Sequence, residues 1–366
     1  MDSNLISSKR VKFGIYESAL ASLLFVIYNF LFIQLYSFVP SSIKSNTFVN
    51  FVASFLLEFT FALAAITVAL SKKIDLKKAS GMSKKISGRQ VWLGFWVSVA
   101  CLLCFGDITT LFLQFLEMLG YNSILSELAM KTFWEYLGYV IVSCITPAIC
   151  EELLFRGVIL SGFKEYGAKI AIIISAIIFT FMHGNAEQTV HQFIIGVIVG
   201  YIFYKTGNLW LGVIIHFFNN FLSVTGAYLY SLLPQSEQVA EVVQLSAVDV
   251  IYSVISTALI AYFGVYWVRW LINKMFVEDA RLNSDAPIEN LNKQTITIDG
   301  QESQVEMTVD GEVTVADSDR MDSENNTEKK EELKPISTMS IVMFSIAGLY
   351  LAFEWLAALL FGFGVV

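Results

Sequence analysis

Long apolar stretches alternate with short polar loops along most of this chain. Nine of them have the length of a membrane-spanning helix: 15–38, 48–70, 91–116, 134–160, 168–186, 190–205, 208–232, 248–272 and 337–364. A helix needs about 20 apolar residues to cross the hydrocarbon core of a bilayer. Only helices and closed barrels satisfy their backbone hydrogen bonds in lipid. The pattern therefore predicts an all-α polytopic membrane protein with about nine transmembrane helices.

The distribution of basic residues predicts the orientation of these helices. The loop 71–90 carries seven Lys and Arg residues and one acid, Asp75. Such loops stay in the cytoplasm, and two spans precede this one, so we expect the N-terminus inside as well. The first stretch is too long for the core of a signal peptide, so we interpret it as a retained span.

One polar block interrupts the apolar pattern before the last span. Residues 275–336 hold 16 Asp and Glu against 6 Lys and Arg, a net charge of −10, which leaves +2 for the rest of the chain. The orientation makes this block an acidic cytoplasmic insert. Alternating residues around Asp299-Gly300 and Asp310-Gly311 indicate a small β-meander, and an unstructured linker is the alternative. We interpret the flanking residues 316–334 as disordered.

Composition supports a membrane protein and gives no sign of nucleic-acid binding. Hydrophobic residues make up 55% and charged residues 15% of the chain, where soluble domains carry about 25% charged residues. No basic face interleaved with aromatic residues suggests a nucleic-acid partner. The four cysteines all lie in predicted spans, and we interpret them as small packing residues.

Three clusters of polar side chains lie inside the apolar stretches. They are Glu151, Glu152 and Arg156; Phe179 and His183; and His216 and Asn220. A charge at the centre of the membrane costs roughly 2.5–3.5 kcal/mol on insertion scales, so such residues usually face a polar interior and serve a site. One buried Glu–Arg pair or one membrane histidine alone is as consistent with structure as with function. Three clusters at helical spacing on nearby spans favour a site.

The two acids of the first cluster differ in whether a basic residue lies one helical turn away. Glu152 and Arg156 are at positions i and i+4, where opposite charges meet on one face of a helix. Glu151 has no basic residue one turn away in either direction, so it is predicted to be the unpaired acid, as a general base requires. Pro147 is predicted to kink the helix one turn earlier.

The histidines allow two kinds of chemistry. His216 and Asn220, one turn apart, can both donate hydrogen bonds to a developing oxyanion, while His183 could hold a water against Glu151. Alternatively, Glu151, His183 and His216 could bind a divalent metal such as zinc in a hydrolytic site. The residues alone do not choose between these possibilities.

The motifs resemble those of a known family. Residues 151–157 read Glu-Glu-Leu-Leu-Phe-Arg-Gly, residues 179–183 read Phe-Thr-Phe-Met-His, and residues 216–220 read His-Phe-Phe-Asn-Asn. Together they resemble, in order and separation, the three motifs of the CPBP family of intramembrane proteases. This family includes the type II CAAX prenyl endopeptidases and the Abi or bacteriocin-processing proteins. The resemblance covers about 148–220.

The resemblance implies a helical core with an active site in a membrane cavity and hydrolysis of a peptide bond near the membrane surface. By analogy, Glu151 would activate water alongside His183. His216 and Asn220 would stabilise the oxyanion, and Glu152 and Arg156 would support the site. The implied partner is a membrane-associated peptide or protein, of CAAX or bacteriocin-like type. The family label of metalloprotease does not decide whether a bound metal takes part in the reaction. The resemblance also does not define the oligomeric state.

These expectations divide the chain into four parts: N-terminal transmembrane helices (1–133), a catalytic transmembrane core (134–274), the acidic insert (275–336) and a C-terminal transmembrane helix (337–366). Two other functions compete with proteolysis. One is a non-catalytic immunity protein that binds peptides. The other is a proton-coupled transporter that uses intramembrane acids such as Glu58, Asp107 and Glu354.

Overall fold

The computed structural model describes residues 12–123, 130–233, 247–283, 293–298, 301–307, 313–316 and 335–365. The long helices are α1 (Ile15–Ser37), α3 (Thr47–Ser71), α5 (Gly88–Met118), α9 (Ala168–Met182), α10 (Thr189–Thr206), α11 (Leu209–Ser231), α12 (Ala247–Asn283) and α13 (Thr338–Gly362), with the short α2 (Ser41–Lys44) and α4 (Leu76–Ala79) between them. Between α5 and α9, one continuous helical segment, 133–166, is built from α6 (Phe133–Tyr139), η1 (Val140–Ile145), α7 (Thr146–Glu152), η2 (Leu153–Leu160), α8 (Ser161–Phe163) and η3 (Lys164–Tyr166).

The all-α polytopic class is confirmed, and the number of long spans differs from the prediction. Every predicted stretch contains a helix, but in the described residues seven helices are long and apolar enough to cross a membrane. The predicted spans 168–186 and 190–205 do not qualify. Helix α9 has 15 residues and ends at Met182, because Gly184 takes a left-handed conformation with φ +55°. The prediction of nine full spans was therefore too high.

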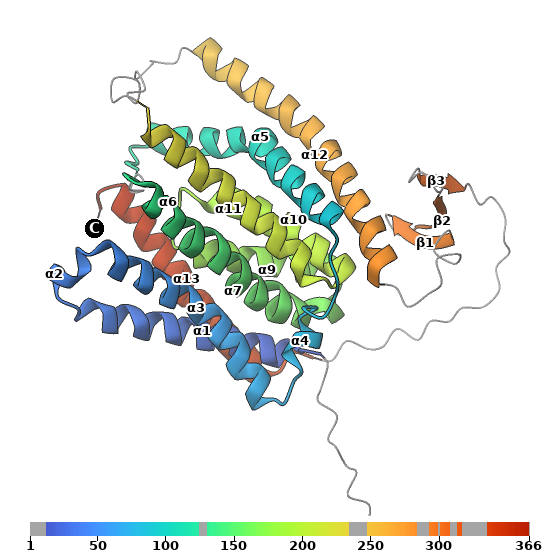
Figure 1. The fold of residues 1–366 in the computed structure, drawn as a ribbon, viewed down its shortest axis with the longest axis horizontal. Coiled ribbons are helices and arrows are strands. Elements are labelled where there is room, and N and C mark those ends of the chain that lie inside the picture. The colour runs from blue at the N-terminus through green and yellow to red at the C-terminus, as the bar shows by residue number, and fades with distance from the viewer. Residues whose placement is uncertain are drawn as a thin grey trace, which may run out of the picture.

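Segment 133–166 crosses the middle of the bundle (Figure 1). Helix α7 packs on α3 on one side and on α11 on the other. The helices α1, α3, η2 and α9 enclose one apolar core, and α5, α10, α11 and α12 enclose a second. The central segment therefore meets both halves of the molecule, and its side chains can reach residues from either half.

The central segment is not a regular α-helix. Wide π-helical turns run over Val140–Ile145 and Leu153–Leu160, with one α-helical stretch between them. Pro147 lies at the start of that stretch and has no amide hydrogen for the usual bond one turn back. The Thr146 hydroxyl donates to the Ile141 carbonyl over 2.8 Å. The predicted irregularity at Pro147 thus takes the form of π turns, which are frequent at functional sites.

The insert contains the β-meander that its sequence pattern indicated. Strands β1 (Lys293–Ile298), β2 (Gln301–Met307) and β3 (Val313–Ala316) pair antiparallel in the order β1-β2-β3. The flanks 317–334 lie outside the described residues. Helix α12 continues to Asn283, past the predicted start of the insert at 275. Its last turns are buried against the bundle, so the insert begins later than expected.

Buried polar contacts hold the last turns of α12 in place. Asp279 accepts hydrogen bonds from Asn208 Nδ2 over 2.6 Å and from Asn283 Nδ2 over 3.0 Å, and Lys84 lies 3.9 Å away. Lys84 also donates to the Thr206 carbonyl. These contacts join the loop before α5, the turn between α10 and α11, and α12.

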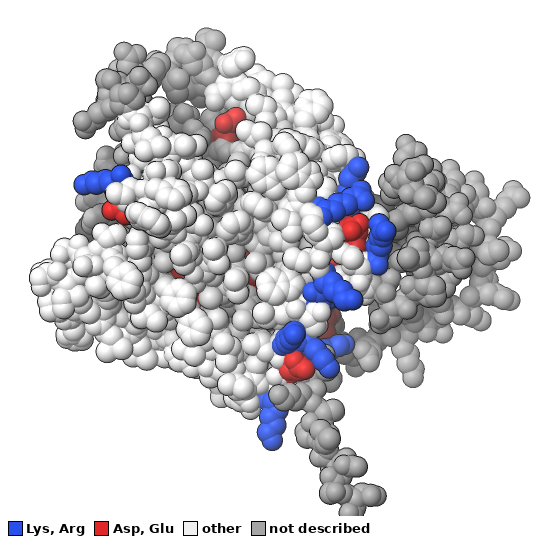
Figure 2. Space-filling model, in the orientation of Figure 1, with Lys and Arg blue, Asp and Glu red and all other residues white. Residues whose placement is uncertain are grey.

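Most of the basic side chains gather around this junction. Figure 2 shows Lys and Arg concentrated near α4 and the last turns of α12, while the rest of this face carries few charges. We call this side of the bundle the basic end; it comprises loop 71–90, Lys164, Lys169, Lys205 and residues 274–283. The opposite side, with α2 and the residues after α13, is the far end. The loops predicted to be cytoplasmic thus lie together.

Replacing Asp279 by Ala should loosen α12. The substitution removes one of the two acceptors of the buried Asn208 amide and leaves only the Lys85 carbonyl. One amide hydrogen is then unsatisfied, and an unsatisfied buried donor costs about 1–3 kcal/mol. We expect a clearly lower thermal midpoint in detergent micelles. Lys77→Ala, an exposed change at the same end, should shift stability by less than about 0.5 kcal/mol. Equal midpoints for the two variants would show that the Asp279 contacts do not hold α12.

Candidate active site

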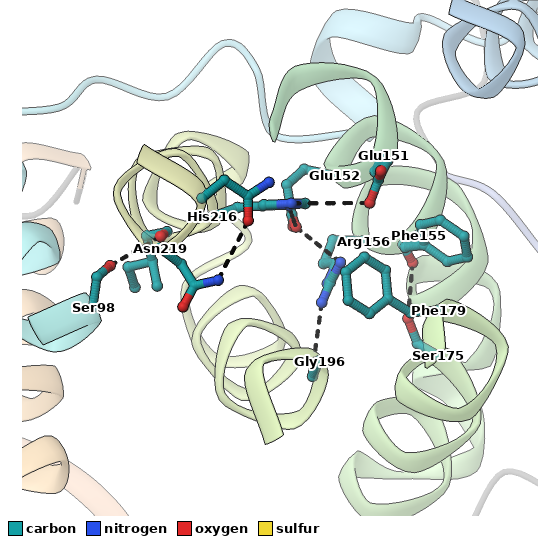
Figure 3. Close-up of polar contacts among 12 residues, drawn as sticks. Ser98, Glu151, Glu152, Phe155, Arg156, Ser175, Phe179, Gly196, His216 and Asn219 are labelled. Atoms are coloured by element: carbon teal, nitrogen blue, oxygen red, sulfur yellow. Dashed lines mark hydrogen bonds and ion pairs between the residues drawn. The ribbon is translucent and has the colours of Figure 1, made fainter. Parts of the chain in front are cut away.

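A buried ion pair lies at the centre of the molecule. Arg156 Nη1 donates to Glu152 Oε1 over 2.8 Å, as the i, i+4 spacing predicted, and both side chains are 1% exposed. His216 Nδ1 donates to the same oxygen over 3.0 Å, and Arg156 Nη2 donates to the Gly196 carbonyl over 3.3 Å. Figure 3 shows these residues converging from η2, α7, α10 and α11. One carboxylate thus links three elements.

Two glycines permit this convergence. A Cβ added at Gly212 on α11 would lie 2.8 Å from Glu152 Oε2 and 2.8 Å from Val199. A Cβ at Gly196 on α10 would lie 3.1 Å from Ala176 on α9. Small residues at such positions let helices approach closely. Gly212 therefore lets α11 approach Glu152 and α10, and Gly196 lets α10 approach α9.

Phe179 contacts both the charged pair and the two histidines. The Arg156 guanidinium lies 4.5 Å from the centre of the Phe179 ring, a distance at which a cation is attracted to the ring face. The His183 and His216 rings meet the same ring edge-on, at 4.9 Å and 5.9 Å. The Phe179-x-x-x-His183 spacing thus places an aromatic wall and a histidine on one side of the site.

A polar cavity of about 650 Å³ lies beside this network. It is bounded by α3, α5, the segment η1–α7, the turn between α9 and α10, and α11. Its polar lining includes Glu58, Glu151, His183, His191, Asn219 and Asn220. A cavity with convergent polar groups, inside a bundle of apolar helices, is the arrangement expected of a binding or catalytic site.

Glu151 is the acid that faces the cavity. Its residue is 4% exposed, and its Oε2 has no hydrogen-bond partner in the described part of the structure. His216 Nε2 lies 3.9 Å from Oε2, and the Glu58 carboxyl group lies within hydrogen-bonding reach. Each of the two adjacent acids has an oxygen without a hydrogen-bond partner. They differ because Glu152 Oε1 accepts from two donors, whereas Glu151 lines the cavity and Glu152 does not.

His183 and Asn220 line the cavity with defined orientations. His183 Nδ1 lies 2.9 Å from the Phe179 carbonyl, which can only accept, so Nδ1 carries the hydrogen and Nε2 of a neutral ring is an acceptor. Asn220 Nδ2 donates to the Ser143 carbonyl over 3.0 Å, and its Oδ1 accepts from Asn219 over 3.3 Å. Ser143 is four residues before Pro147, so its carbonyl lacks the regular α-helical partner.

The structure places His216 differently from the sequence-based expectation. His216 was expected beside Asn220 as a second donor to an oxyanion. It is buried, is not among the residues that line the cavity, and faces the two acids instead. The physical reason is the Glu152 carboxylate, which accepts the Nδ1 hydrogen and turns the ring away from Asn220.

Three cavity residues were missed by the sequence-based reasoning. Glu58 was noted only as an isolated acid, because nothing in the sequence pairs α3 with α7. His191 and Asn219 were not considered, although they bond to each other over 3.0 Å at the cavity wall. The sequence signal for Glu58 was a polar residue in an apolar span. No sequence signal indicated that His191 and Asn219 pair with each other.

The set considered for a metal ion does not assemble. In the described ranges, no group of three or more His, Cys, Asp or Glu side chains is arranged to hold a metal. His183 Nδ1 faces a backbone carbonyl, and His216 Nδ1 is bonded to Glu152. We therefore derive no chemical step through a metal, and metal binding by Glu151, His183 and His216 stays a prediction.

A buried acid close to a histidine at the wall of a cavity can take part in general acid–base chemistry. Residues 133–222 match the family model described as type II CAAX prenyl endopeptidase Rce1-like. The match runs from α6 into α11 and contains all three motifs, and it supports the resemblance to the CPBP and CAAX proteases that the motifs indicated. Comparison with curated proteins and with solved structures gives no match.

Glu152→Gln should destabilise the fold strongly. Removing one partner of a buried ion pair leaves an uncompensated charge and costs about 3–5 kcal/mol. The double variant Glu152→Gln/Arg156→Met removes both charges, so we expect it to recover a large part of the loss. Thermal midpoints and the monodisperse fraction in size-exclusion chromatography measure both effects. A double variant no more stable than the single one would contradict the assignment of the cost to the unpaired guanidinium.

Proposed function

We propose that this protein is an endopeptidase that hydrolyses a peptide bond of a membrane-associated substrate at the cavity beside Glu151. The observation that carries the proposal is the position of Glu151, a buried acid without a hydrogen-bond partner for its Oε2, in the wall of a cavity that His183 and Asn220 also line. The family match supports an intramembrane protease of the CAAX type in general. The residue roles below are proposals built on the geometry.

In the first step, a water molecule donates one proton to Glu151 while its oxygen attacks the carbonyl carbon of the scissile bond. His183 Nε2 accepts the second hydrogen of that water in a hydrogen bond and so orients it. The resulting tetrahedral intermediate carries a negative oxygen. Glu151 then returns its proton to the nitrogen of the departing amine, and the C–N bond breaks to give a carboxyl product and an amine product. This use of one carboxyl group as base and then acid is general acid–base catalysis.

Asn220 stabilises the negative oxygen. Its Nδ2 carries two hydrogens and only one is needed for the Ser143 carbonyl, so the other can be donated into the cavity. Because both ends of the amide are already bonded, little reorganisation is needed when charge develops. Preorganised donors of this kind contribute about 2.7–4 kcal/mol in other hydrolases.

Glu152, Arg156 and His216 act as positioning residues. The ion pair and the Glu152–His216 hydrogen bond fix α7 against α11, which sets the distance between Glu151 and Asn220. His216 Nε2, 3.9 Å from Glu151 Oε2, also limits where that carboxyl group can rotate. His216 thus supports the acid rather than the oxyanion.

The substrate is a peptide or protein segment at the membrane, and the N-terminus and the acidic insert are cytoplasmic. The orientation is supported by the gathering of basic residues at one end of the bundle. Substrates of the CAAX type and of the bacteriocin-like type would both present a peptide bond within reach of a membrane cavity. The family match supports the general class and leaves the particular substrate to experiment.

Glu151→Gln should lower cleavage at least about 100-fold, because loss of a general base typically costs 10²–10⁴-fold in rate. His183→Ala should also lower cleavage clearly, because the water loses the acceptor that orients it. The measurement compares protein termini in cells that carry the wild type or a variant at equal expression. Glu354→Gln, a matched change of an exposed acid on α13 away from the cavity, should cleave like the wild type. Termini that persist fully in Glu151→Gln would favour a peptide-binding role.

A further inference from the structure

The residues that line the cavity are distributed unevenly along their helices. On α3, Ser54 and Glu58 lie in the half that is farther from the basic loop after Ser71. On α11, the lining residues start at Asn219, near the middle, and continue to Val224 toward the far end. The cavity thus occupies the half of these two helices that faces the far end.

The other elements show the same distribution. On α5 the lining runs from Leu102, near the middle, to Leu113, close to the far end of the helix at Met118. On α10 it includes His191 and Gln192, in the first turn and distant from Lys205 at the basic end. Four separate helices therefore place the cavity between mid-depth and the far end.

The rim of the cavity is polar and exposed. Ser54, Thr110 and Ser223 line the cavity and are exposed, and each comes from a different helix: α3, α5 and α11. At 1.5 Å per residue, each lies about 10–12 Å along its helix from the far end. Three hydroxyl groups around an opening suit water and a peptide backbone better than lipid tails.

The basic side of the cavity is closed. Every residue of η2, which continues from the acids toward the basic end, is buried. Arg156, Phe155 and Phe179 fill the space below Glu151 and Glu152, and each is no more than 1% exposed. No residue of η2 lines the cavity. A substrate that came from the basic end would have to pass through this packed layer.

We infer that substrates reach Glu151 from the far end, which the basic residues assign to the extracytoplasmic side of the membrane. This identifies the substrate class as peptide segments exposed at the extracytoplasmic leaflet, such as the outer portion of a leader or membrane anchor, rather than carboxyl-terminal segments in the cytoplasm. The side of access follows from the cavity alone, whereas the substrate class also rests on the proposed protease function.

Thiol labelling in intact cells tests the side of access without any need for activity. Ser54→Cys, Thr110→Cys and Ser223→Cys should react with a membrane-impermeant maleimide added outside. Lys78→Cys, exposed at the basic end, should react only after permeabilisation. The unsubstituted chain is the background control, because its four cysteines are buried. Rim cysteines that react only after permeabilisation, or not at all, would overturn the inference, as would labelling of Lys78→Cys from outside.

Mapping of the cut sites tests the substrate class. Termini that depend on Glu151 should fall in extracytoplasmic segments next to the membrane. If they fall in cytoplasmic segments, the inferred substrate class is wrong while the protease function stands. If rim cysteines label from outside but no Glu151-dependent termini exist, the side of access stands and both the protease function and the substrate class fail.

Discussion

The buried pair of Glu152 and Arg156 is the interaction on which the rest of the site depends. Two opposite charges in the interior of a membrane protein are far less costly when they pair with each other and find further partners nearby. Here the carboxylate also binds His216, and the guanidinium also binds the Gly196 carbonyl and faces Phe179. The three sequence motifs are thus one network. Each contributes a group that the pair needs, and the active acid is placed by its neighbour.

The irregular backbone of the central segment has a role in the same network. A proline and π turns release backbone groups that a regular helix would use internally. The released Ser143 carbonyl then orients the Asn220 amide from another helix. The site therefore gains a fixed hydrogen-bond donor from a local defect in the segment that carries the acids. Helical membrane proteins can tolerate such defects when a neighbouring helix satisfies the freed groups.

The sequence was sufficient for features that depend on local periodicity. The helices, the Glu152–Arg156 pair and the β-meander follow from spacings of two to four residues, and the structure contains all of them. Features that depend on contacts between distant segments were not predictable. The orientation of His216, the approach of Glu58 to Glu151 and the continuation of α12 to Asn283 each depend on a partner more than 60 residues away. The count of full spans failed at α9, where a left-handed glycine ends the helix earlier than hydropathy suggests.

The packed layer of η2 also affects how well the membrane around this protein stays sealed against ions. A water-accessible cavity that reaches into a membrane shortens the insulating path for protons and ions. Because every residue of η2 is buried and none lines the cavity, the cavity ends at Glu151 on this side. Water can then enter to react, yet no continuous aqueous route joins the two compartments. A protein with the proposed function can thus bring water to a peptide bond inside the bilayer without opening a path across it. A carrier with alternating access must instead keep the path closed by moving its helices.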